Sequence, residues 1–62
     1  MADFVIHNEG TILLFRPLTK AAREWLEENV QEDAQWFGDA LVVEHCYAGA
    51  FAVGLVNAGL RP

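Results

Sequence analysis

Cysteine is almost absent from this chain of 62 residues. The single Cys46 has no intramolecular partner, so a disulfide scaffold is excluded and a reducing cytoplasm is indicated. The first residues also lack the basic start and long apolar core of a secretory signal. Because so short a chain buries only about 60% of the surface that its unfolded form exposes, we expect one marginally stable domain or an oligomer. That single domain spans residues 1–62.

Positive charge is also scarce. Lys and Arg number 4 against 9 Asp and Glu, which gives a formal net charge of −5 at pH 7. Nucleic acid is therefore not expected as a direct partner, because duplex binding rests on Lys and Arg facing phosphates. An anionic membrane surface would be repelled, and the uncharged run over residues 46–57 is shorter than the ~20 residues of a membrane span. The charge balance predicts a basic protein surface as the partner.

Residues that carry catalysis or bind metals are few. His7, His45 and Cys46 are the only soft metal ligands, and zinc needs four ligands or three plus water. The chain has no Ser–His–Asp order, phosphate loop or dinucleotide fingerprint. A carboxylate pair acting as acid and base would need a dry pocket, which a surface helix does not provide. We therefore predict no enzyme, no catalytic residues, no metal and no cofactor.

The apolar content of 53% is high enough to exclude a disordered acidic tail. Two β-branched and aromatic runs, residues 4–6 and 11–15, flank a turn that closes at Gly10, and they predict a β-hairpin. The apolar residues 12–15 do not alternate with polar ones, so we expect both faces of this strand to be covered.

Two helices are predicted. The first covers residues 20–29, with Thr19 as its N-cap. Its buried face recurs at spacings of three and four: Leu18, Ala22, Trp25, Leu26 and Val30. The segment "HCYAGAFAVGLVNAGLRP" predicts the second helix, ended by Gly59, with a strand as the less favoured alternative. Its expected buried stripe is Tyr47, Phe51, Leu55 and Ala58.

A turn at Gly38 and Asp39 leads into residues 40–44, an apolar run that predicts a central third strand. The loop before this turn carries Trp36 and Phe37. The resulting order is ββαβα. We expect an α+β fold in which two helices pack on one face of a three-stranded antiparallel sheet.

The stretch "REWLEENVQEDAQWF" gathers negative charge at the end of the first helix. Cations precede anions along this helix, which opposes its dipole by ~0.3–1 kcal/mol per charge. If the helix continues, Glu24, Glu28 and Glu32 line one ridge. The charge is either a solvated face or a row of carboxylates presented to a basic groove. The candidate binding residues are Glu24, Glu27, Glu28, Glu32, Asp33, Trp36 and Asp39.

Two other features each allow two interpretations. Trp36 and Phe37 either cap the core or form a contact hot spot. Small residues beside the aromatic stripe of the second helix suit either close packing on the sheet or a homodimer contact. These small residues are Ala48, Ala50, Ala52, Gly54 and Ala58. We therefore expect a monomer or a weak homodimer.

The segment "IHNEGTILLFRPLTKAAREWLEENVQEDAQWFGDALVVEH" resembles a group of small proteins from phages, prophages and their bacterial hosts. The group shares the pattern "NEG(S/T)…LRPLT…A(R/A)EWL…EDAQWFG", and the resemblance covers residues 6–47, about two thirds of the chain. The chain departs from this group at Phe15 and Cys46, where more polar or basic residues are expected.

The resemblance implies an anti-CRISPR protein that mimics DNA and inhibits a type I-C system in the cytoplasm of a bacterial host. Its acidic surface would occupy the basic DNA-binding subunit of the surveillance complex, where the large subunit reads the motif flanking its target. Target DNA would then be excluded by competition. The alternative hypothesis is a small prophage structural or assembly protein that acts as a homodimer through the apolar second helix.

Overall fold

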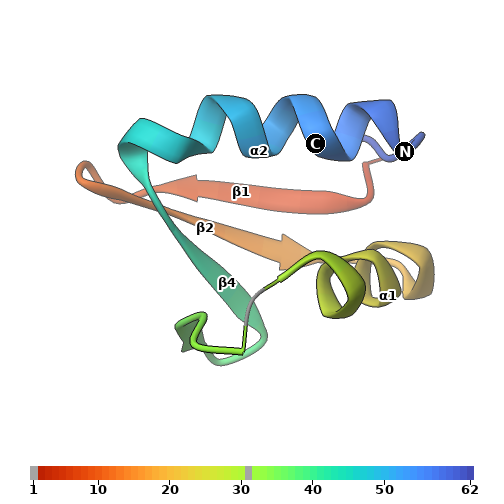
Figure 1. Ribbon diagram of the computed structural model, residues 1–62, viewed down its shortest axis with the longest axis horizontal. Coiled ribbons are helices and arrows are strands. Elements are labelled where there is room, and N and C mark those ends of the chain that lie inside the picture. Colours follow the sequence, from red (N-terminus) through yellow and green to blue (C-terminus); the bar gives the residue numbers. More distant parts are fainter. Residues whose placement is uncertain (1, 31) are drawn as a thin grey trace.

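The structure, a computed structural model, describes residues 2–30 and 32–62 (Figure 1). Its elements in chain order are β1 (Phe4–Asn8), β2 (Ile12–Pro17), α1 (Lys20–Asn29), β3 (Trp36–Phe37), β4 (Ala40–Glu44) and α2 (His45–Asn57). The strands form one antiparallel sheet in the order β1-β2-β4-β3. The α+β class and the two helices are confirmed, but the sheet has four strands rather than three.

The additional strand is β3, in the segment that the sequence predicted as a loop. Trp36 pairs with Leu41 and Phe37 with Ala40, across the expected turn at Gly38. Gly38 adopts a φ of 63°, which a residue with a side chain rarely takes. Because β3 has only two residues, its pairing with β4 leaves no periodic pattern in the sequence.

The predicted β1–β2 hairpin is confirmed. Its strands pair from Phe4 opposite Pro17 to Asn8 opposite Leu13. The turn is held locally, since the Asn8 side-chain oxygen accepts a hydrogen bond from the Gly10 N–H at 2.8 Å. Gly10 has a φ of 94°, so it supplies the left-handed conformation that the turn requires.

Helix α1 begins as its sequence predicts. The Thr19 hydroxyl accepts a hydrogen bond from the Ala22 N–H at 3.1 Å, which satisfies one of the free amides of the first turn. Ala22 and Leu26 are buried, whereas Leu18 is 52% exposed and lies outside the core. The helix ends at Asn29, as its predicted range has it, so the continuation toward Glu32 on which a longer carboxylate ridge depends does not occur.

Both helices contribute to a single core on one face of the sheet. Phe51 of α2 packs edge-on against Phe15 of β2 at 4.9 Å and Trp25 of α1 at 5.3 Å, measured between ring centroids. The buried cluster draws on both helices and three strands: Phe4, Phe15, Ala22, Leu26, Leu41, Val43, Ala48 and Leu55. Figure 1 shows α1 and α2 as separate rods beside a strongly fanned sheet.

The opposite face of the sheet has no helix over it in the described part of the chain. Ile12 and Leu14 point to this face and remain half-buried, so the expectation that both faces of β2 are covered was wrong. Val5 on β1 and Phe37 on β3 lie on the same face and are 46% and 67% exposed. The two helices already contact one another on the Phe15 side, and residues 2–30 and 32–62 supply no third layer.

Helix α2 is confirmed, but its buried side is rotated from the predicted stripe. Ala48 and Leu55 are buried and Phe51 is half-buried, while Tyr47 is 65% exposed. Ala58 is also exposed. An apolar residue at nearly every position gives the pattern no preferred side, so the contacts with Phe15 and Trp25 set the rotation.

Asp3 ties the start of α1 to the end of α2. Its carboxylate accepts hydrogen bonds from the Thr19 hydroxyl and from the Arg61 backbone N–H, both at 2.9 Å. The Asp3 N–H in turn donates to the Arg61 carbonyl at 2.9 Å. The bond from the Arg61 N–H, followed by that from Thr19, lowers the pKa of the Asp3 carboxyl below its usual 3.8.

Candidate functional site

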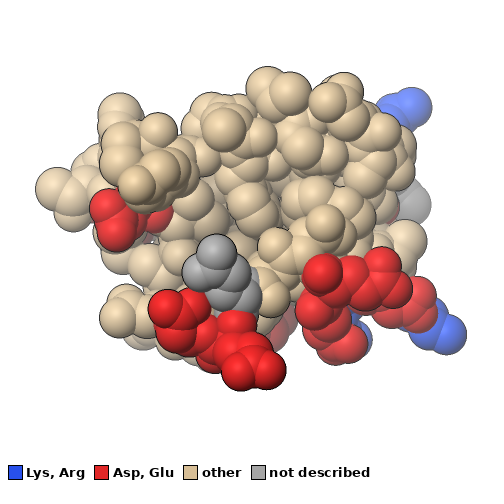
Figure 2. Space-filling view, in the orientation of Figure 1, with Lys and Arg blue, Asp and Glu red and all other residues tan. Residues whose placement is uncertain are grey.

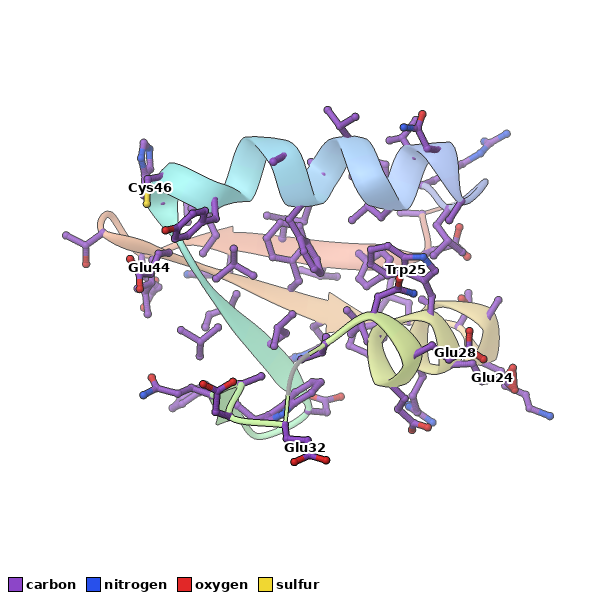
Figure 3. All side chains as sticks on the ribbon, viewed as in Figure 1. Glu24, Trp25, Glu28, Glu32, Glu44 and Cys46 are labelled. Atoms are coloured by element: carbon purple, nitrogen blue, oxygen red, sulfur yellow. The ribbon has the colours of Figure 1, made fainter. Side chains whose placement is uncertain are left out.

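The acidic outer side of α1 is positioned by the burial of its inner side. Ala22 and Leu26 face the core, which turns Glu24, Glu27 and Glu28 toward solvent. Figure 3 shows Glu24 and Glu28 next to one another on the outside of α1. No acidic residue lies in the first turn and no basic residue in the last, so the helix dipole does not account for this placement.

The carboxylates fall into two groups rather than one ridge. The first group is Glu24, Glu27 and Glu28 on α1; the second is Glu32 and Asp33, in the segment that leads to β3. Figure 2 shows them as separate red areas on the same face of the molecule. Helix α1 ends at Asn29, whose side-chain amide donates to the Trp25 carbonyl at 2.9 Å, so the Glu24–Glu28–Glu32 ridge that a longer helix would form is not present.

Little of this negative charge is neutralised within the described residues. Lys20 lies 4.0 Å from a Glu24 oxygen, but its side chain is 90% exposed, and such a pair contributes little. Arg23 and Glu27, four residues apart on α1, do not form an ion pair among the described residues. Four candidate carboxylates therefore have no ion pair in this part of the chain: Glu27, Glu28, Glu32 and Asp33.

Asp39 differs from the other candidates. Its carboxylate lies 3.3 Å from the Arg16 Nε, so its charge is balanced by a neighbouring strand. It also lines a shallow groove with Arg23, Glu27 and Trp36. The structure thus brings Asp39 close to Glu27 and Trp36, but it places two arginines beside them.

Trp36 and Phe37 project to opposite faces of the sheet, as neighbours on a strand must. Trp36 pairs with Leu41 on the helix side and is 46% exposed, so it is neither a buried cap nor a free side chain. Phe37 lies on the open face and lines a shallow hollow with Val5 and Leu14. Of the two aromatics, only Trp36 shares a groove with the candidate carboxylate Glu27.

A second groove, over β4, was not anticipated from the sequence. Asp33 and Glu44 both line it, together with Tyr47 and Phe51. The sequence predicts Tyr47 in the buried stripe of the second helix and Glu44 only as the last residue of a strand. The direct junction between β4 and α2, at Glu44 and His45, is the signal that could have placed both side chains at this edge.

The described residues do not assemble any group of three or more His, Cys, Asp or Glu side chains able to hold a metal ion. Across residues 2–30 and 32–62, neither helix has the length and apolarity to cross a membrane. No protein-family model, curated protein or solved structure matches the chain.

Proposed function

We propose that the protein is an inhibitor that binds the basic, nucleic-acid-binding site of another protein and excludes the nucleic acid. The observation that supports this proposal is the set of exposed carboxylates on one face. These are Glu24, Glu27, Glu28, Glu32 and Asp33. Of them only Glu24 has an ion pair among the described residues, at 4.0 Å from Lys20.

The mechanism is competition between two anions for one cationic surface. Duplex DNA carries about one negative charge per 1.7 Å of its axis, and its partners bind the phosphates with Lys and Arg. The carboxylates on α1 stand in for phosphates at one part of such a site. Glu32 and Asp33 stand in for them at another. Because Trp36 lies in a groove with Glu27, it adds an apolar contact at the edge.

The resemblance to small phage and prophage proteins names the first target to test. It is the basic DNA-binding subunit of a type I-C CRISPR surveillance complex, in the cytoplasm of a bacterial host. The inhibitor would bind this subunit directly and would not bind the DNA. The association should weaken as salt is raised, since complementary surface charges are screened within about 10 Å at 0.1 M ionic strength.

A DNA-shift assay with purified type I-C surveillance complex tests the proposal. Preincubation with about a tenfold excess of the protein should remove the shift of a target duplex and leave the complex intact on a sizing column. If the complex binds its target equally well with and without the protein, this target is wrong.

Matched variants then test the surface. The double variant Glu28→Gln and Glu32→Gln removes two charges from the face, and Glu9→Gln with Glu44→Gln removes two charges that lie outside the candidate set. If each lost carboxylate forms an exposed ion pair with the partner worth ~0.2–1 kcal/mol, the first variant should bind the partner about tenfold more weakly. The second variant should bind with little change. Equal weakening of inhibition by both variants would mean that inhibition depends on the net charge and not on this face.

A further inference from the structure

The outer side of α2 carries a regular row of exposed residues that the core does not use. The outer seam of α2, as we name it, consists of Cys46, Gly49, Val53 and Val56. Its spacing of three, four and three residues is that of the contact positions in a two-helix coiled coil. Val53 and Val56 are 60% and 52% exposed, so the fold of one chain leaves them largely in water.

Charge is absent from α2, from His45 to Asn57, apart from the titratable His45 at its start. Figure 2 shows uncharged surface along the length of α2, with most of the acidic groups along the lower edge of the same view, while Glu44 lies just before the start of α2 (Figure 3). The carboxylate next to this side is Glu44, at 3.9 Å from the Cys46 Sγ, so the rest of α2 offers a basic partner no charge to pair with. A second copy of the chain could meet this side while its own carboxylates point away.

Among the described residues, no contact and no backbone angle within the single chain accounts for a glycine at position 49. A Cβ built at this position would meet nothing within 4 Å, and the residue has no left-handed φ that would require glycine. Gly54, in contrast, lies 3.8 Å from the Trp25 ring by the same measure, so it packs against α1. A helix-weakening residue without a local reason indicates a close approach by another backbone or side chain.

The outer seam of α2 is complementary to itself when a second copy runs antiparallel. The seam is symmetric about Phe51, so Cys46 faces Val56 of the second copy, and Gly49 faces Val53. At each level a small residue, Cys46 or Gly49, then packs against a β-branched valine of the second copy. A parallel pair would instead place Gly49 against Gly49 and Val53 against Val53, which leaves a gap at one level and crowding at the next.

The ends of α2 favour the same direction. Glu44 precedes the helix and Arg61 follows it, and both side chains are exposed. In an antiparallel pair the Glu44 end of each copy lies beside the Arg61 end of the other. Antiparallel helices also oppose their dipoles, whereas parallel ones would bring like ends together.

We propose that the outer seam of α2 binds the same seam of a second copy, antiparallel, to form a weak homodimer. A helix of 13 residues is about 20 Å long. The contact is therefore well below the roughly 800 Å² per partner of a stable interface, and the dimer depends on concentration. This inference does not rest on the proposed function, because none of the four seam residues belongs to the candidate binding set.

Sedimentation equilibrium of the full chain, from about 10 µM to 1 mM, is the first test. The average mass should rise reversibly from one chain toward two. Val53→Lys should hold the protein monomeric throughout, and Val5→Lys, an equivalent change on the open sheet face, should not. Circular dichroism checks that both variants keep their fold. A monomer at 1 mM, or a dimer that survives Val53→Lys, overturns the proposal.

Oxidative cross-linking tests the direction of the helices. In the antiparallel pair the two Cys46 residues are about 15 Å apart along the axis, beyond the reach of a disulfide. Val56→Cys places a thiol opposite Cys46 of the second copy, so this variant should form a covalent dimer rapidly. The unmodified chain and the double variant Cys46→Ala with Val56→Cys should not. Rapid cross-linking of the unmodified chain through Cys46 would overturn the antiparallel arrangement.

Discussion

Both helices bury one side in the same core, but their outer sides differ in polarity. Helix α1 buries Ala22 and Leu26 and covers its other side with charge. Helix α2 buries Ala48 and Leu55, yet its exposed side carries valine, alanine and glycine. The outer side of α1 is therefore charged and well hydrated, whereas the outer side of α2 leaves apolar side chains exposed to water. The difference shows that an apolar residue in a small domain is not necessarily a core residue.

Neither outer side contributes much to the free energy of unfolding, so both are available for interactions with other molecules. The charges of α1 oppose its dipole and form one loose ion pair, so they contribute little to folding. The outer seam of α2 likewise makes few contacts within the chain. Both helices therefore have an outer side that can change without loss of the fold.

The largest expected effect lies within α2, between two adjacent residues. Leu55 has no exposed surface and Val56 is 52% exposed. Leu55→Ala should cost about 2–5 kcal/mol of unfolding free energy because it leaves a cavity in the core. Val56→Ala should change it by less than about 0.5 kcal/mol. Urea denaturation at low protein concentration measures both, and similar losses would mean that α2 is rotated from the described orientation.

Asp3 should matter next, since it joins the two helices. Asp3→Asn weakens the hydrogen bonds to Thr19 and Arg61 and should lower the melting temperature at pH 7. The pKa of Asp3 is lowered in the fold, so its stabilisation is complete above the usual 3.8 and is lost as pH falls through the lower folded value. The melting temperatures of the variant and the parent should converge in acid. A constant difference at every pH would rule out the carboxylate charge as the cause.

Gly49→Ala should stabilise the monomer by about 0.5–1 kcal/mol, because alanine favours a helix and the space at Gly49 is open. The measurement is urea denaturation below 10 µM, where self-association is negligible. Gly10→Ala is the contrasting control and should destabilise, since Gly10 has a φ of 94°. A loss of stability from Gly49→Ala under these conditions would mean that the space at Gly49 is not open within the single chain, against the described structure.

The smallest expected gain is on α1. Glu28→Lys places a cation near the C-terminal end of the helix and should raise stability by about 0.3–1 kcal/mol. The same change should weaken the proposed binding to a basic partner. Melting temperature and the DNA-shift assay, performed on one preparation, compare the two effects. If stability and inhibition rise together, the α1 carboxylates do not carry the proposed function.

Local signals in the sequence predicted much of the fold. Gly10 closes its hairpin and Thr19 caps α1, as their residue types require. Gly59, with a φ of 85°, ends α2, where the Leu60 N–H donates to the Leu55 carbonyl at 3.0 Å. Each of these outcomes depends on a few neighbouring residues, so the sequence alone could specify it.

Outcomes that depend on distant residues were not predictable in the same way. The pairing of Trp36 with Leu41 rests on a two-residue strand. The face of the sheet at Leu14 is open because both helices pack against the other face. The rotation of α2 about its axis depends on contacts with Trp25 and Phe15. For the candidate site, exposure of the carboxylates followed from the periodicity of α1. The position of Glu32 relative to them stays open in the sequence, because it depends on whether the helix continues past its predicted end at Asn29.

The hydrogen bonds between Asp3 and Arg61 bring two distant parts of the chain together. A short glycine-rich linker could therefore join the ends, and new ends could be opened at the exposed Gly38 turn. Such a circular permutant would keep the β1–β2 hairpin intact, because the new ends lie in the turn between β3 and β4. A label attached near residue 3 or near residue 61 would emerge at almost the same point, which makes the fold a convenient carrier for paired probes.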